Sequence, residues 1–284
     1  MSKLPPYVSI YERLWHYGFL LLCGLIFFFL IFPLIVVIPL SFNVVPYFTF
    51  TKEMLALDPA GYSLTWYEDF FSNRNWQGAV RNSVIIAIFA TLLSTTLGTL
   101  AALGLSRPNM PAKTLVMSLL ISPMIVPLII SAAGMFFFYS KIGLAYSHLG
   151  VVLAHAAIGT PYVVITVTAT LVGFDETLIR ASGSLGAKPI RTFFKVIMPL
   201  ITPGVVSGAL FAFITSFDEV VLIYFIADAA QKTIPIQMWS GLRQQISPSI
   251  LAVATLLVAF SIVLLIAIEM LRRRSERLRT TLPS

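Results

Sequence analysis

Residues 17–41 read YGFLLLCGLIFFFLIFPLIVVIPLS and contain no charged side chain. At 1.5 Å per residue, a helix of this stretch is long enough to cross the roughly 30 Å hydrocarbon core of a bilayer. Its uncharged stretch is too long for a signal peptide, and no small-residue cleavage site follows it. We therefore expect it to stay in the mature protein as a transmembrane helix.

Five further apolar runs follow, divided by short polar segments. Hydrophobic residues make up 58% of the chain and charged residues only 11%, well under the roughly 25% charged content of a soluble domain. Such a chain cannot hide its apolar surface from water, so lipid is its solvent. The sequence predicts an all-α polytopic membrane protein with six transmembrane helices, at residues 17–41, 79–105, 114–139, 148–173, 201–226 and 249–271.

The cationic residues report the orientation of these helices. The formal net charge is +7, but the Lys and Arg residues fall between the apolar runs and form no basic stripe interleaved with aromatics, so we expect no nucleic-acid partner. With the N-terminus inside, most of them lie in cytoplasmic segments, which predicts that both termini are cytoplasmic. The Arg272 to Arg279 cluster is interpreted as an anchor to anionic lipid headgroups.

Small residues recur at four-residue spacing in two of the runs and allow close helix packing. Prolines inside the spans predict kinks. The loop 42–78 carries several aromatic residues and is expected to form an aromatic belt or a short amphipathic helix at the membrane surface. The small residues are Ser94, Gly98 and Ala102, then Gly204, Gly208 and Ala212; the prolines are Pro33, Pro39, Pro123, Pro127 and Pro161; the aromatic residues are Trp66, Tyr67, Phe70, Phe71 and Trp76.

The segment 174–199 predicts a hairpin of two short helices between the fourth and fifth spans. It reads FDETLIRASGSLGAKPIRTFFKVIMP. Asp175 and Glu176 suit the positive N-terminal end of the first helix, Gly186 a left-handed C-terminal cap, and Pro189 the first turn of the second helix. Apolar residues among its charges favour a surface that docks against another protein over a solvated connector.

This hairpin resembles the signature of bacterial ABC importer permeases, which is Glu-Ala-Ala, three residues, Gly, nine residues, Ile-x-Leu-Pro. The corresponding residues are Arg180-Ala181-Ser182, Gly186 and the stretch 196–199, with Arg180 in place of the family's Glu and Ser182 in place of Ala. The resemblance implies a type I ABC importer permease fold, one permease domain over residues 1–284, and a coupling-helix loop at 174–199 that enters a cleft of the cytoplasmic ATPase. The residues it assigns to this coupling are Arg180, Ala181, Ser182, Leu185, Gly186, Ala187 and Pro199.

Shorter stretches resemble the second of the two paired permeases of spermidine/putrescine-type importers. They are residues 62–67, 81–83, 216–221, 234–236 and 247–248. The resemblance implies import of a small solute such as a polyamine across the bacterial inner membrane, although importers for iron and opines share these stretches. It also implies three kinds of protein partner: a dimer of ATP-binding subunits, a second homologous permease and an external solute-binding protein. Because the chain has no G-x-x-x-x-G-K-[ST] loop, ATP and Mg are expected on the partner ATPase, with no cofactor and no enzymatic activity in this chain.

Asp218 and Glu219 are acidic residues well inside a predicted span, where a charge costs about 2.5–3.5 kcal/mol. They are candidates for the translocation pathway, because carboxylates attract a cationic solute. A structural pair satisfied by a neighbouring helix explains them equally well, and adjacent helical positions point about 100° apart, so both are not expected to face one cavity. His155 in the fourth span is expected to bond a neighbouring helix and to bind no metal, and Cys23 lies alone, so no disulfide within the chain is possible.

Two other functions are compatible with a polytopic chain. A secondary transporter or channel would work without an ATPase, but such proteins often carry internal repeats and more buried ionisable groups. A membrane scaffold would not require a glycine-turned hairpin or kinked spans. The sequence favours the ATP-driven importer over both.

Overall fold

The structure, a computed structural model, describes residues 9–107, 109–175, 177–244 and 247–280. The described residues are predominantly helical and contain no β-strand beyond one isolated bridge between Asn43 and Tyr62. The predicted all-α class is therefore confirmed. Glu176 and the side chains of the Arg272 to Arg279 cluster lie outside the described residues.

The chain divides into two compact units, Met1–Asn73 with Gly241–Ser284, and Arg74–Ser240. In the first unit, helix α1 begins with a capping box, in which Ser9 and Glu12 each bond the backbone N–H of the other. None of the most apolar part of α1 is buried within the chain, so its surface is available to lipid or to another subunit. The elements of this unit are α1 (Ile10–Leu40), α2 (Lys52–Leu55), η1 (Pro59–Gly61), α3 (Thr65–Ser72) and α13 (Ser249–Thr280).

The loop after α1 is held by hydrogen bonds of its own side chains. The side-chain amide of the buried Asn43 donates to two loop carbonyls at 2.6 and 3.0 Å, and the backbone carbonyl of Asn43 accepts from the indole N–H of Trp66 at 2.6 Å. Asp69, on α3, accepts a hydrogen bond from Ser249 at the first residue of α13, at 2.8 Å. The predicted short helix is present as α3, and Trp66 packs into the loop itself.

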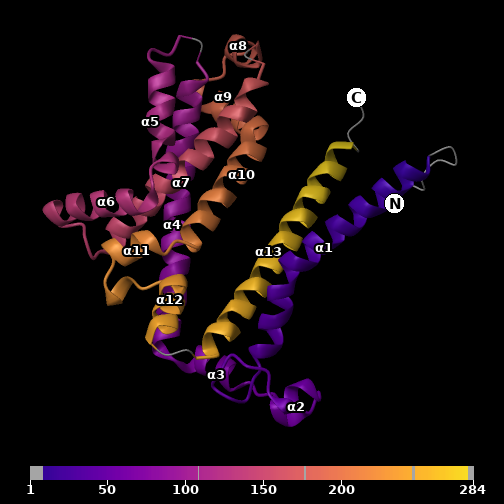
Figure 1. Cartoon of the computed structure of the whole chain (residues 1–284). Coiled ribbons are helices and arrows are strands. Elements are labelled where there is room, and N and C mark those ends of the chain that lie inside the picture. Colours follow the sequence, from indigo (N-terminus) through magenta and orange to yellow (C-terminus); the bar gives the residue numbers. More distant parts are fainter. Residues whose placement is uncertain (1–8, 108, 176, 245–246, 281–284) are drawn as a thin grey trace. The chain divides into compact units, whose positions relative to one another are not determined.

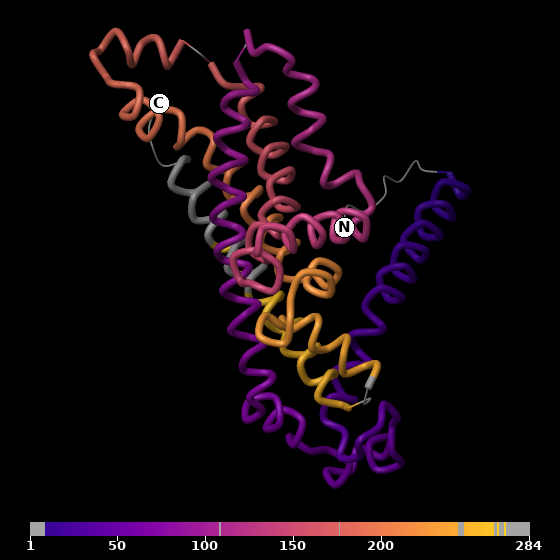
Figure 2. The backbone as a smooth tube through the Cα atoms, turned by 90° about the vertical axis from the view of Figure 1, so that its left-hand side faces the viewer, coloured from indigo at the N-terminus to yellow at the C-terminus, as the bar shows by residue number. Residues whose placement is uncertain are grey.

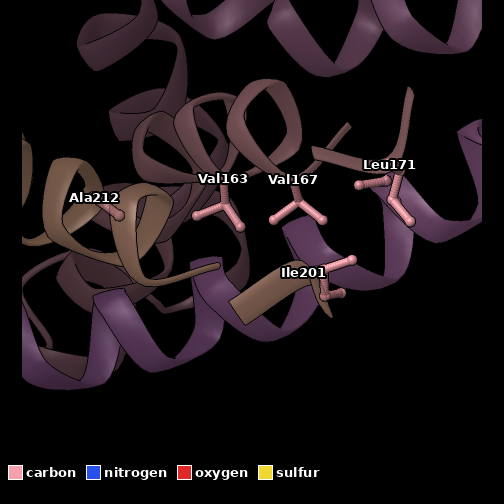
Figure 3. Packing of buried hydrophobic residues seen from close by; sticks show 6 residues of the cluster. Val163, Val167, Leu171, Ile201 and Ala212 are labelled. Atoms are coloured by element: carbon pink, nitrogen blue, oxygen red, sulfur yellow. The ribbon is translucent and has the colours of Figure 1, made fainter. Parts of the chain in front are cut away.

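The second unit is built around three helices, α4, α7 and α10, which lie side by side (Figures 1 and 2). Buried valines of α7 face Ala102 of α4 and Ile201 and Ala212 of α10; Figure 3 shows Val163, Val167 and Leu171 pointing into this core. The elements are α4 (Arg74–Leu105), α5 (Lys113–Ile125), α6 (Leu128–Ile142), α7 (His148–Val172), α8 (Thr177–Ser184), α9 (Pro189–Thr192), the π-helical η2 (Phe193–Ile197), α10 (Met198–Phe217), α11 (Val221–Ile226) and η3 (Ala229–Gln231), followed by α12 (Ile234–Gln244).

The small residues predicted to pack do so at the contacts of these three helices. A Cβ on Gly208 would lie 2.5 Å from the hydroxyl of Thr166 and 2.7 Å from the Cα of Val163, and a Cβ on Gly98 would lie 2.6 Å from the Cβ of Val163. Ser94 donates to the carbonyl of Ala156 at 3.1 Å. The backbones of α4 and α10 can approach α7 this closely because glycine has no side chain.

Two of the predicted spans are interrupted. The residues predicted as one span at 114–139 form α5 and α6, which meet at an angle of 102° beside Pro127. The residues predicted as one span at 201–226 form α10, which ends at Phe217, and the separate α11. Among the described residues, four helices are long and apolar enough to cross a membrane, or five if the bent pair is one span, and α13 adds a shorter apolar stretch at Ser249–Val263.

Candidate functional site

The segment between α7 and α10 forms the predicted hairpin. Helix α8 ends in a Schellman motif, in which the N–H of Ala187 bonds the carbonyl of Ser182 and the N–H of Gly186 bonds that of Gly183. Gly186 has φ +79°, a backbone conformation that would be strained in a residue with a side chain. Pro189 opens α9, so the predicted local structure of this segment is confirmed.

The start of α8 is stabilised by Asp175. Its carboxylate accepts a hydrogen bond from the N–H of Thr177 at 2.9 Å. Hydrogen bonds from the side chain and backbone of Thr177, and then the charge of Arg180, hold the pKa of the Asp175 carboxyl below its ordinary value. The ionised carboxylate therefore favours the folded first turn of the hairpin.

The residues predicted to couple to an ATPase divide into two groups. Arg180, Ala181, Leu185 and Gly186 are exposed, and 88% of the surface of Leu185 is open. An apolar side chain this exposed at the tip of a hairpin is a feature of a docking surface.

Ser182 and Ala187 are instead turned toward the protein. The hydroxyl of Ser182 lies 2.8 Å from that of Thr192, which ties α8 to α9. Ala187 lines a cavity behind the hairpin. Pro199 is exposed in the first turn of α10, beyond the π-helical η2, so it is separated from the tip by α9 and η2.

The two candidate carboxylates lie in the interruption between α10 and α11. One oxygen of Glu219 accepts hydrogen bonds from the N–H groups of Val221 at 2.6 Å and Leu222 at 3.0 Å. Glu219 is only 7% exposed and caps the N-terminus of α11. Asp218 is exposed, and its carboxylate accepts no hydrogen bond from the residues that the structure describes. The geometry therefore gives the two acids different surroundings, one satisfied and one available.

His155 fixes the end of α10 that precedes this interruption. It is fully buried in α7, and its Nδ1 lies 2.9 Å from the hydroxyl of Ser216. His155 lies about 10 Å along α7 from its first residue, at the end of the core away from the hairpin. The expected bond to a neighbouring helix is confirmed.

Asn82 and Ser83 of α4 have a positioning role that the sequence did not reveal. Asn82 donates to the carbonyls of Ala230 and Lys232, both at 2.9 Å, and Ser83 accepts from the N–H of Ile234 at 2.8 Å. Both side chains are buried. They hold the segment that follows α11 against α4. Residues 81–83 and 234–236 are both among the stretches that resemble polyamine-type permeases, but that resemblance does not indicate that they contact each other.

Comparisons with known proteins agree with this arrangement. Residues 94–277 match the family described as "Binding-protein-dependent transport system inner membrane component". The chain is 31% identical over 244 residues to the spermidine/putrescine transport system permease protein PotC of Haemophilus influenzae, covering 86% of this chain and 92% of that one. It is 30% identical over 241 residues to the putrescine transport system permease protein PotI of Escherichia coli, covering 82% and 86%.

A solved structure supports the fold. A chain of a bacterial ABC transporter that imports the acidic polysaccharide alginate superposes with a TM-score of 0.70 at 15% identity, over 95% of this chain and 99% of that chain. At this identity the likeness concerns the fold alone. The chain therefore has the predicted type I ABC importer permease fold.

Proposed function

Because the chain belongs to the family of binding-protein-dependent transport system inner membrane components, we propose that it is the subunit through which an ATP-driven importer moves a polyamine. The chain is a non-catalytic, multi-pass permease subunit of an ABC importer in the inner membrane. The finer assignments concern the substrate, the partners, the orientation and the residues that act.

The hairpin is the observation that carries the coupling proposal. A Schellman cap at Gly186 and the Ser182–Thr192 contact make α8 and α9 one stiff unit that presents Leu185 outward. An exposed leucine on a stiff support is suited to a preformed cleft, because little conformational freedom is lost on docking. We assign Arg180, Ala181, Leu185 and Gly186 to direct contact with an ATP-binding subunit, and Ser182, Ala187 and Pro199 to support of the hairpin.

The polyamine assignment rests on the relatives and on Asp218. The relatives are named for transport of spermidine and putrescine, which carry several positive charges at neutral pH. An exposed carboxylate in the interruption of a membrane helix attracts such a cation. Glu219 is already engaged by α11, so Asp218 is the residue that we assign to the translocation pathway.

The remaining partners follow from the same assignment. An importer of this kind needs two ATP-binding subunits that carry ATP and Mg, a second homologous permease and an external solute-binding protein. The hairpin faces the cytoplasm in this arrangement, with both termini on the same side, as the distribution of Lys and Arg predicts. No cofactor is assigned to this chain.

Site-directed crosslinking tests the coupling. In a Cys23→Ala background, Ala181→Cys of the assembled importer is expected to form a crosslink to a cysteine placed in the ATP-binding subunit, with an efficiency that changes when ATP binds. Asn109→Cys, an exposed position in another loop of the same unit, is the matched control. If Ala181→Cys traps the ATP-binding subunit no better than Asn109→Cys, the coupling assignment is wrong.

Reconstitution separates this function from a secondary transporter or channel. Proteoliposomes that contain the complete importer are expected to move radiolabelled putrescine only when ATP is supplied on the side of the membrane where the ATP-binding subunits lie. Polyamine movement by the purified chain alone, driven by an ion gradient and indifferent to the ATPase, would favour the alternative.

A further inference from the structure

A cavity of about 470 Å³ lies between the hairpin and the ends of α4 and α7. This size is within the roughly 300–1,000 Å³ range of small-molecule sites. Its walls come from five elements, α4, α7, α8, α9 and η2, and from the residues that directly follow α4 and α7. They include Leu103 and Arg107 at the end of α4, Leu171 and Phe174 at the end of α7, Ile179 of α8, Thr192 of α9 and Phe193 of η2. The hairpin therefore does not rest directly on the bundle at this point.

The cavity combines apolar walls with one available cation. The polar groups of its other lining residues are already engaged, since Ser106 donates to the carbonyl of Leu103 and Thr192 contacts Ser182. The guanidinium of Arg107 makes no hydrogen bond or ion pair with the described residues, and no Asp or Glu is among the residues that line the cavity. An apolar space with a single unpaired cation is complementary to an amphiphile with an anionic head.

The surroundings of the cavity indicate where such an amphiphile comes from. Large apolar side chains within three positions of its lining residues are exposed, with Leu100 at 58%, Val172 at 83% and Phe194 at 60%. Leu100 lies near the end of α4 and Val172 is the last residue of α7, so these apolar side chains are exposed at the same helix ends that line the cavity. Basic pockets between transmembrane helices on the cytoplasmic side commonly bind anionic lipid headgroups.

We infer that this cavity is a binding site for an acidic phospholipid of the cytoplasmic leaflet, with the lipid phosphate on Arg107 and the first part of one acyl chain against Leu103, Leu171 and Phe193. The bound lipid fills the space behind the hairpin and braces it against the core of the bundle. The cytoplasmic location rests on the orientation assigned under the proposed function, but lipid binding is measured without any transport.

Two substitutions test the site from its two ends. Arg107→Gln removes the charge and keeps a long side chain. Gly183→Leu fills the cavity from α8, and this change is sterically unopposed because a Cβ at Gly183 meets no atom within 4 Å. The matched control is Lys113→Gln, which removes one exposed cation at the start of α5 that does not line the cavity.

The experiment uses the assembled importer in nanodiscs of phosphatidylglycerol and phosphatidylcholine. Native mass spectrometry is expected to detect retained phosphatidylglycerol, and Arg107→Gln is expected to lower its retention roughly fivefold, the value of one Lys or Arg near an anionic surface. Gly183→Leu should lower retention as well, and Lys113→Gln much less. A phosphatidylglycerol with a photoreactive acyl chain should label the peptides around residues 103–107, 171–174 and 193–197.

Three outcomes of these lipid measurements would overturn the inference: equal losses in Arg107→Gln and Lys113→Gln, equal retention of phosphatidylcholine, or photolabelling confined to other helices. Crosslinking from position 107 to an acidic segment of the ATP-binding subunit in place of lipid would also overturn it. Failure of the Ala181→Cys crosslink, in contrast, concerns the coupling assignment and leaves the lipid site standing.

Discussion

The different surroundings of Asp218 and Glu219 predict that removing the Glu219 side chain lowers stability, whereas removing the Asp218 charge lowers transport. Glu219→Ala deletes the acceptor of two backbone N–H groups at the start of α11, and Leu222 is fully buried, so water cannot replace the acceptor. Hydrogen bonds to charged groups contribute about 1.5–3 kcal/mol each, and loss of a capping side chain costs about 0.5–2 kcal/mol. Because one oxygen accepts both bonds, they are not independent, and we expect a loss of about 2–3 kcal/mol in the free energy of unfolding.

Asp218→Asn is expected to leave stability within about 0.5 kcal/mol, because the exposed carboxylate accepts no hydrogen bond from the described residues. Its effect is on transport. An ion pair between Asp218 and a passing ammonium group, partly hydrated in the path, is worth about 1 kcal/mol. Polyamine uptake should therefore fall roughly fivefold in Asp218→Asn, and Asp218→Glu, which keeps the charge, should restore most of it.

Two measurements on the same purified importer check these expectations. Reversible unfolding in detergent gives the stability of each variant, and ATP-driven uptake of radiolabelled spermidine into proteoliposomes gives its activity. Glu219→Gln keeps an oxygen acceptor without the charge and should be intermediate in stability. The reasoning is refuted if Glu219→Ala is as stable as the unsubstituted protein, or if Asp218→Asn takes up spermidine at the unsubstituted rate.

Gly208→Ala is expected to destabilise the bundle by about 1–3 kcal/mol, the usual cost of overpacking, because its Cβ would meet the backbone of Val163. The matched Gly134→Ala has no atom within 4 Å of its Cβ and should be neutral or stabilising in the same unfolding assay; equal behaviour of the two variants would contradict the packing described. Because the pKa of Asp175 is lowered in the folded hairpin, its contribution is complete above the ordinary carboxylate pKa and is lost as pH falls through the lowered value. The protection factors of the α8 amides, which correct for the intrinsic pH dependence of hydrogen exchange, should therefore fall below about pH 4, and Asp175→Asn, which keeps the acceptor but does not titrate, should not show this fall.

The hairpin was predictable because its signals are local. A glycine at a helix end, a proline in a first turn and an acid before a helix each determine the backbone within a few residues. The contact of Ser182 with Thr192 was not predictable in this way. It depends on the angle between α8 and α9, which no local pattern determines; the sequence alone therefore does not separate Ser182 from the exposed residues of α8.

The interruption at Asp218 was missed for a different reason. Apolar residues continue on both sides of it, from Ile214 to Ile226, and no proline or glycine lies between them, so hydropathy gives one span. The signal for this interruption is Glu219, because an acidic residue directly before an apolar run is typical of the start of a new helix. The sharp bend at Pro127 was foreseen only as a kink, since the packing of α6 and α11, not the proline alone, sets the angle.

The helices between the hairpin and Asp218 suit the proposed transmission of movement from one to the other. Residues Pro189–Phe217 form one nearly continuous helical segment, through α9, η2 and α10. Gly204, Gly208 and Ala212 seat α10 against α7 with no room for sliding, and the His155–Ser216 contact fixes its far end. Since packed helices shift as units and do not deform continuously, we expect α7 and α10 to move together if an ATP-binding subunit displaces the hairpin as proposed. On this proposal the adjustment would be concentrated where regular α-helix is absent, at η2 beside the hairpin and at the break that carries Asp218.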